Sequence, residues 1–297
     1  MIMKKRKRLS KQARTNILGY ILVLPMVLGF IIFSLLPLLQ TIKGSFYDMT
    51  DFYWDTSKEY YVGFGNFREL FEDQDFIKAI KNTIYLMIGI PIGMVIAFFL
   101  ATILNSKYVK HKKPYLIIYY LPAVSSAVAI GIVWKWVFNA EYGLINNMFN
   151  LNIAWLSSPS VIKTTLIMKG VWGGIGGTLL LYYASIQNIS LDMYEAADVV
   201  GANCLQKTFA ITIPLVKNTS FYILVTGVIG GIMAFADNYV VASSSAANTI
   251  VYYLYMEMQK GNYGLVTAGS LIVFLALFFI TLIQFYLNGL GRKGGKR

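Results

Sequence analysis

The sequence predicts an all-α, polytopic membrane protein with six transmembrane helices and a short helical element on its cytoplasmic face. Hydrophobic residues make up 57% of the 297 residues, whereas soluble domains are typically about 45–50% apolar. Charged residues make up only 13%, and the mean hydropathy is +0.58. The apolar residues also gather into segments of roughly 20 residues or more, the length at which a helix crosses the hydrocarbon core of a bilayer.

Six segments meet this requirement of length and composition. They are residues 17–42, 83–104, 115–138, 162–187, 219–242 and 264–287. The first follows a basic stretch, as the apolar part of a signal peptide does, but it is too long and lacks a small-residue cleavage pattern. We therefore expect it to be retained. Residues 17–287 are expected to form a single transmembrane domain, with an external loop at 43–82 and an internal loop at 188–218.

The distribution of positive charge predicts the orientation of these spans. The basic tails at 1–16 and 288–297, together with the loops on their side, carry 17 Lys and Arg residues, whereas the opposite loops carry six. Because Lys and Arg collect on the cytoplasmic side, both termini are expected to be cytoplasmic. The net charge of +12 is then explained by topology, and we expect no nucleic-acid partner.

Several kinds of chemistry are excluded by residues that the chain lacks. One cysteine (Cys204) and one histidine (His111) make neither a disulfide framework nor a Cys/His metal site. No G-x-x-x-x-G-K-[ST] phosphate-binding loop occurs, and the glycine run at 173–177 has no lysine after it. We therefore predict no catalytic, cofactor or metal residue and no enzyme activity in this chain.

Glycines recur four residues apart within the predicted spans. The pairs are Gly89 and Gly93, Gly170 and Gly174, Gly173 and Gly177, and Gly227 and Gly231. Small residues at this spacing let helix backbones approach closely in lipid. We interpret the pairs as packing contacts within the chain.

The internal loop 188–218 has the pattern of a helix, a bend and a second helix. Asp192 and Glu195 have the spacing of a capping box, and Gly201 suits a bend or the end of a helix. The second helix is expected to run from about Leu205 and to stop before Pro214, because proline restricts the residue before it. The first helix carries few charges and several small residues, so it is slim enough to enter a cleft in a partner.

The same loop resembles the EAA loop of the permease subunits of type I ABC importers. The matching residues are Glu195-Ala196-Ala197, Gly201, Ile211 and Pro214, and the clear departure is Val200, where that family commonly has aspartate. Four more segments are similar to the carbohydrate-uptake branch, the maltose- and glycerol-phosphate-type permeases. They are residues 62–67, 121–123, 134–138 and 141–143. The resemblance covers most of residues 17–287.

This resemblance implies a coupling helix that inserts into a groove on a separate ATPase. The residues it assigns to ATPase docking are Glu195, Ala196, Ala197, Asp198, Gly201, Ala202, Ile211 and Pro214. It also implies a second, homologous permease as a heterodimer partner, two ATP-binding subunits that hold ATP and Mg, and an extracellular solute-binding protein that delivers a sugar. The location it implies is the bacterial cytoplasmic membrane.

Polar and aromatic residues inside the spans are candidates for the substrate path, because charges in a membrane are costly and usually functional. The candidates are Lys169, Trp172, Tyr182, Asp237, Asn238 and Tyr239. Asp237 is expected near the external end of the fifth span. Aromatic rings could stack on sugars while amides and carboxylates bind hydroxyl groups. The alternative for Asp237 is a structural ion pair.

Two rival functions stay open at this point. An ABC permease for a non-sugar solute would share the docking loop but not segment 134–143. An ATP-independent secondary transporter would be expected to show broken half-helices in matching halves of the chain, and it would leave the loop around Glu195 without a task.

Overall fold

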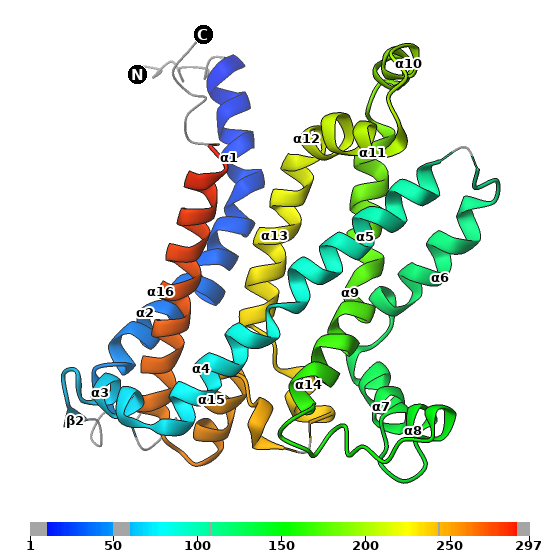
Figure 1. Ribbon diagram of the computed structural model, residues 1–297. Helices are drawn as coiled ribbons and strands as arrows, with labels where there is room; N and C mark the ends of the chain where they lie inside the picture. Colours follow the sequence, from blue (N-terminus) through cyan, green and yellow to red (C-terminus); the bar gives the residue numbers. More distant parts are fainter. Residues whose placement is uncertain (1–10, 50–59, 107, 243, 290–297) are drawn as a thin grey trace, which may run out of the picture.

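The computed structural model describes residues 11–49, 60–106, 108–242 and 244–289, and this part of the chain is built almost wholly of helices (Figure 1). Its one sheet is a short antiparallel hairpin of β1, Tyr47–Asp48, and β2, Tyr60–Tyr61. The predicted all-α membrane fold is confirmed. The basic tails at 1–16 and 288–297 lie largely outside the described residues, so their position stays a prediction.

Three helical segments in the described chain are individually long and apolar enough to cross a membrane. They are Asn16–Gly44, Gln74–Asn105 and α16, Tyr263–Leu287. The first contains α1 (Lys11–Phe30) from Asn16 onward, the π-helical turn η1 (Ile31–Leu35) and α2 (Leu36–Gly44). The second contains α4 (Gln74–Leu86) and α5 (Gly89–Asn105).

Two further segments pass the same test only as bent pairs of helices. One pair is α6 (Lys112–Val124) with α7 (Ala127–Val137), bent by 101°, and the other is Cys204–Leu215 with α13 (Lys217–Ile232), bent by 65°. The sixth segment, α9 (Ile162–Gln187), has 26 residues, but glycines and two lysines lower its hydropathy. Length and composition therefore support three of the six predicted spans, and five if each bent pair crosses as one broken span. The span at α9 stays a prediction.

The shorter helices lie at two opposite ends of the molecule. Figure 1 shows the start of α1, the end of α16 and the short helix α10 (Leu191–Val199) at one end. The other end carries α3 (Gly65–Glu72), α8 (Leu144–Phe149) and α15 (Ile250–Gln259). The two ends are called here the α10 end and the α15 end.

The prediction of one straight helix over 115–138 is wrong. The helix stops at Val124, and Ser125 and Ser126 take extended backbone conformations before α7 begins. Pro122 lies in the last turn of α6 and has no N–H to donate there. The Ser125 Oγ donates to the Leu121 carbonyl at 2.8 Å and satisfies one of the carbonyls at the helix end.

The prediction of one helix over 219–242 is also wrong. α13 ends at Ile232, and a separate helix, α14 (Ala236–Val240), follows. Two hydrogen bonds to the segment after α14 hold this break. The Thr249 hydroxyl donates to the Ala234 carbonyl at 2.7 Å, and the Asn238 amide of α14 donates to the Ala247 carbonyl at 2.6 Å. The partners in these hydrogen bonds are 15 and 9 residues apart. The periodicity of a helix therefore does not predict them.

The span expected at 83–104 begins earlier than predicted. α4 starts at Gln74 because the Asp73 side chain caps it, accepting from the Asp75 backbone N–H at 2.7 Å. The predicted external loop 43–82 therefore contains α3 and the first turns of α4 in addition to the hairpin.

Helix α9 is packed closely against α5 and α6. Ala97 and Ala101 of α5 and Leu179 of α9 are fully buried in one apolar cluster. On α6, the backbone carbonyl of Tyr119 lies so near Gly176 that a Cβ added there would be 2.1 Å from the oxygen. The absence of a side chain at Gly176 therefore sets the distance between α6 and α9.

We predict that Gly176→Ala destabilises the protein by about 1–3 kcal/mol, because the added methyl group would force α6 and α9 apart. Gly173→Ala is the matched control on the same helix, since nothing lies within 4 Å of its Cβ position and alanine favours helix. Thermal unfolding in detergent, followed by tryptophan fluorescence, checks both. Equal melting temperatures for the two variants would contradict the close contact.

Candidate functional site

The loop at 188–218, predicted to be internal, folds into a projecting helix and a bent return. Helix α10 has no buried residue and stands away from the bundle at the α10 end (Figure 1). It is followed by Gly201, whose φ of +73° is a left-handed conformation that glycine adopts without steric cost. The chain then returns through α11 (Cys204–Lys207), the π-helical turn η3 (Thr208–Thr212) and α12 (Ile213–Leu215). The predicted helix–bend–helix is therefore present.

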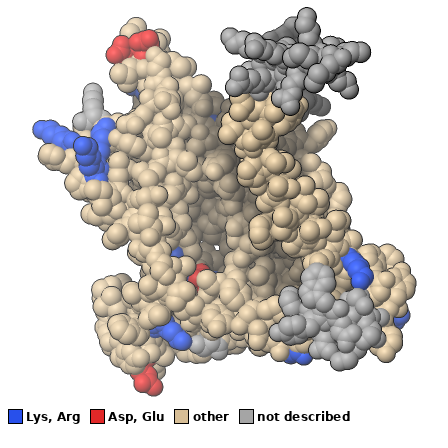
Figure 2. Space-filling model, turned by 180° about the vertical axis from the view of Figure 1, so that it is seen from behind, with Lys and Arg blue, Asp and Glu red and all other residues tan. Residues whose placement is uncertain are grey.

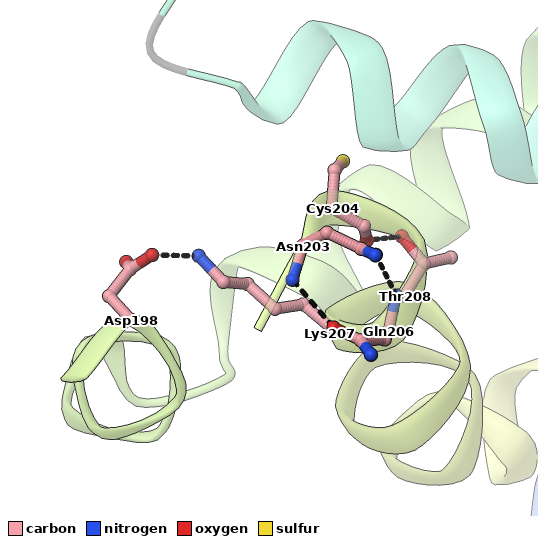
Figure 3. Close-up of polar contacts among 6 residues, drawn as sticks. All are labelled: Asp198, Asn203, Cys204, Gln206, Lys207 and Thr208. Carbon is pink, nitrogen blue, oxygen red and sulfur yellow. Dashed lines mark hydrogen bonds and ion pairs between the residues drawn. The ribbon is translucent and has the colours of Figure 1, made fainter. Parts of the chain in front are cut away.

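The capping of these helices differs from the prediction. Ser190, not Asp192, is the N-cap of α10, and Asp192 lies in its first turn. The capping box occurs instead at α11, where the Asn203 side chain accepts from the Gln206 N–H at 2.9 Å and the Gln206 side chain accepts from the Asn203 N–H at 2.8 Å (Figure 3). An Asp in the first turn still favours the helix, because its charge opposes the positive end of the helix dipole.

The second helix also runs further than predicted. Instead of stopping before Pro214, the helical path continues through it to Leu215. The preceding turn, η3, is π-helical, and this wider turn accompanies a proline that cannot donate to the usual carbonyl. Ile211 lies in this turn and is half-buried, whereas Pro214 is exposed.

Two contacts tie α10 to the return segment, and a third ties it to the bend. The Lys207 ammonium forms an ion pair with the Asp198 carboxylate across the bend (Figure 3). The Tyr194 and Thr212 hydroxyls are hydrogen-bonded at 2.9 Å, and the Ala202 N–H donates to the Ala197 carbonyl at 3.0 Å. The orientation of α10 relative to the bundle is thus set by contacts at both ends of the bend.

The outer surface of the loop is unusually apolar for an exposed element. Val199 and Val200 are 88% and 81% exposed, and Leu205 and Phe209 are also exposed. Of the predicted docking residues, Glu195, Ala196, Asp198 and Gly201 are exposed as well, while Ala197 and Ala202 are half-buried. A projecting, mostly apolar surface of this kind is typical of a protein-binding site.

A cavity of about 550 Å³ lies between α4–α5, α9 and α13. Its wall contains eight glycines, and at five of them a Cβ would have nothing within 4 Å. These five are Gly93, Gly170, Gly174, Gly177 and Gly230. Figure 2 shows a hollow on one face of the molecule whose walls carry few charged side chains. The cavity is the second candidate site.

The glycine pattern was therefore only partly interpreted correctly from sequence. Gly89, Gly227 and Gly231 do meet side chains of neighbouring helices, as predicted for close packing. Gly170 and Gly174, in contrast, leave space open. The four-residue spacing was the available signal, but spacing alone does not tell whether the face it marks meets another helix or a cavity.

Lys169 and Asp237 are joined by the structure at one end of this cavity. Lys169 lies on α9 with its side chain 9% exposed, and it forms an ion pair with Asp237, which is 33% exposed. Asp237 and Asn238 line the cavity. Asp237 lies on the separate helix α14 and not on the fifth span, which is a correction to its predicted place.

The other predicted path residues lie elsewhere. Tyr182 is buried between helices, where its hydroxyl donates to the Ser220 Oγ at 3.0 Å. Trp172 meets the Trp134 ring edge-on at 5.3 Å between centroids, and Tyr239 stacks on Phe235 at 5.4 Å. None of the three is among the residues that line the cavity. Their role in a substrate path stays a prediction, and their positions add no support to it.

A bundle of long apolar helices, with a projecting loop at one end and a cavity between the helices, is the architecture expected of a membrane translocation subunit. The chain belongs to the family described as the binding-protein-dependent transport system inner membrane component, which matches residues 78–290.

Similar proteins cover nearly the whole chain. The arabinooligosaccharides transport system permease protein AraP of Halalkalibacterium halodurans is 30% identical over 94% of this chain and 90% of its own length. The sn-glycerol-3-phosphate transport system permease protein UgpA of Pectobacterium atrosepticum is 29% identical over 92% of this chain and 94% of its own length. A bacterial alginate ABC transporter, solved in complex with an alginate pentasaccharide-bound periplasmic protein, has a chain with a TM-score of 0.84 at 26% identity, covering 98% of this chain and 100% of that one.

We predict that Asp237→Asn lowers the free energy of unfolding by up to about 3 kcal/mol, because Lys169 would stay buried without a counter-charge. Lys169→Met should cost less, since the Asp237 carboxylate is one-third exposed and water can solvate it. The double variant should recover most of the loss. Chemical unfolding of the three variants in detergent checks this order, and equal losses in all three would show that the pair is not energetically coupled.

Proposed function

We propose that this chain is the permease subunit of an ATP-driven ABC importer that takes up sugars or oligosaccharides. The observation that carries this proposal is helix α10. It projects from a chain of the binding-protein-dependent family with no buried residue, and it is held in place by the Asp198–Lys207 pair and the Gly201 turn. A helix with this exposure and this apolar surface needs a partner.

The partner of α10 is proposed to be an ATP-binding subunit. Glu195, Ala196 and Asp198 would face it directly, and the Gly201 turn would present them. Ile211 and Pro214 belong to the return segment that joins α10 to α13. ATP and Mg would be held by two such subunits and not by this chain.

A second, homologous permease is the proposed partner of the transmembrane part. In the 18-residue apolar window of Asn16–Gly44, none of the residues is buried within the chain. Exposed apolar side chains run along α1 and η1. A heterodimer would cover part of this surface and would close the open side of the cavity.

The remaining assignments concern location and cargo. We place residues 17–287 as one transmembrane domain in the bacterial cytoplasmic membrane, with both tails and α10 on the cytoplasmic side. The α15 end would then face an extracellular solute-binding protein. The names of the relatives support a sugar or sugar derivative, and they range from arabinooligosaccharides to sn-glycerol-3-phosphate and alginate, so they leave the charge of the cargo open.

The proposal is tested by purifying the chain from native membranes and identifying the co-purifying proteins by mass spectrometry. An ATPase and a second permease should accompany the wild type. Glu195→Ala and Gly201→Asp should lose the ATPase and keep the second permease, because they change only the α10 end. Gly201→Asp also places a side chain on a residue with positive φ.

Glu141→Ala is the matched control, since Glu141 is exposed in the loop between α7 and α8, far from α10 (Figure 1). It should retain both the ATPase and the second permease. A chain that purifies alone, with all variants alike, would overturn the proposal and favour an ATP-independent transporter.

A further inference from the structure

We propose that the cavity wall of this chain selects uncharged cargo, and that Asp237, fixed by Lys169, is the residue that determines this specificity. The inference rests on the proposed function and deepens it, because it names the chemical class of the sugar. It predicts a neutral oligosaccharide and excludes uronates, sugar phosphates and sugar sulfates.

The first step is the charge of the wall. Among the described residues that line the cavity, Asp237 is the one ionisable side chain, and the rest are glycines, aliphatic residues, methionines, three threonines and Asn238. An anionic group entering such a wall would lose water and find no cation to replace it. Burial of an unpaired charge is strongly unfavourable.

The second step is that the nearby cation is already committed. Lys169 is on α9, only 9% of its side chain is exposed, and its ammonium is bound to Asp237. It is not one of the residues that line the cavity. A cargo carboxylate that bound Lys169 would compete with Asp237 for the same ammonium group. Two anions would then lie next to one buried cation.

The third step is the direction of the hydrogen bonds. The Thr226 hydroxyl donates to the Tyr222 carbonyl, the Thr249 hydroxyl to the Ala234 carbonyl and the Asn238 amide to the Ala247 carbonyl. Each of these three groups uses one proton on a protein carbonyl, which leaves the Thr178 hydroxyl and the second Asn238 N–H as donors. The hydroxyl, amide and carboxylate oxygens of the wall keep lone pairs that can accept. The wall therefore offers more acceptors than donors. Sugar hydroxyls can donate to such a wall, but carboxylates and phosphates can only accept.

The consequence for the cargo follows from these three steps together. A neutral sugar can donate hydroxyl protons to the Asp237 carboxylate at the end of the cavity and lay its apolar ring faces on the glycine wall. The glycines leave room for the ring, since no atom lies within 4 Å of the Cβ positions of Gly170 and Gly174.

The inference can be tested with a single-cysteine reporter in the cavity. Cys204 is the chain's one cysteine, so a Cys204→Ser background with Gly174→Cys carries one thiol, at a position with open space around it. The importer is purified with its co-purifying subunits in nanodiscs. The rate of labelling by a small thiol reagent is then measured with increasing maltotriose or trigalacturonate, a neutral and an anionic trisaccharide of equal length.

Maltotriose should slow labelling at a concentration about tenfold lower than trigalacturonate, a ratio that corresponds to 1.4 kcal/mol. In Asp237→Asn the unpaired Lys169 should leave a cation directly behind the cavity wall, so that trigalacturonate becomes the better protector. The Lys169→Met/Asp237→Asn double variant carries neither charge and should lose that gain. If Asp237→Asn fails to assemble, the wild-type comparison decides alone.

Equal protection by the two trisaccharides in the wild type, or better protection by trigalacturonate, would overturn the inference. Protection by neither would also overturn it, because the cavity would then hold no free sugar. None of these outcomes changes the co-purification of the ATPase. Failure of the charge selection is therefore distinguishable from failure of the proposed importer function.

Discussion

A helix that crosses a membrane lies in a medium that offers no hydrogen bonds, so each of its backbone N–H and C=O groups needs an internal partner. Regular helix meets this need without help. At the breaks it is met by specific side chains: Ser125 bonds the end of α6, and Thr249 bonds the carbonyl of Ala234 after α13. The positions of the breaks are therefore inseparable from the contacts that satisfy them.

Helix α9 joins several of these constraints in one element. Gly176 lets α6 approach closely, and Leu179 buries against α5. Another part of its surface, at Gly170 and Gly174, faces the cavity, and Lys169 anchors α14 at the cavity end. Glycine thus has two effects on this helix. At Gly176 it lets the backbones of α6 and α9 come together, and at Gly170 and Gly174 it leaves space for the cavity.

The two candidate sites are connected through α13. The return segment from α10 passes through η3 and α12 directly into α13, and α13 contributes Thr226, Gly227 and Gly230 to the cavity wall. The bend of 65° between them lies at Val216, which is almost fully buried. A displacement of α10 by a partner would therefore act on a helix that borders the cavity, which is the connection that a coupled importer requires.

The membrane class, the approximate places of the apolar segments and the helix–bend–helix of residues 188–218 could all be predicted from the sequence. The prediction of spans from composition and segment length depends only on how apolar side chains partition between water and lipid. The prediction of a turn at Gly201 depends on a local backbone preference. The residues Glu195 to Gly201 were identifiable for the same reason, since they form one short continuous pattern.

Where helices break, which glycines border a cavity and which charges meet all depend on contacts between segments that lie apart in the sequence. Lys169 and Asp237 are 68 residues apart, and their pairing depends on α14 folding away from α13, which in turn depends on Thr249 and Asn238 bonding to distant carbonyls. Tyr182 illustrates the same limit, because its ring is buried against Phe98 of α5, a neighbour that no periodicity in α9 reveals. Local patterns record what each segment prefers, whereas a cavity and an ion pair exist only through the packing of several segments together.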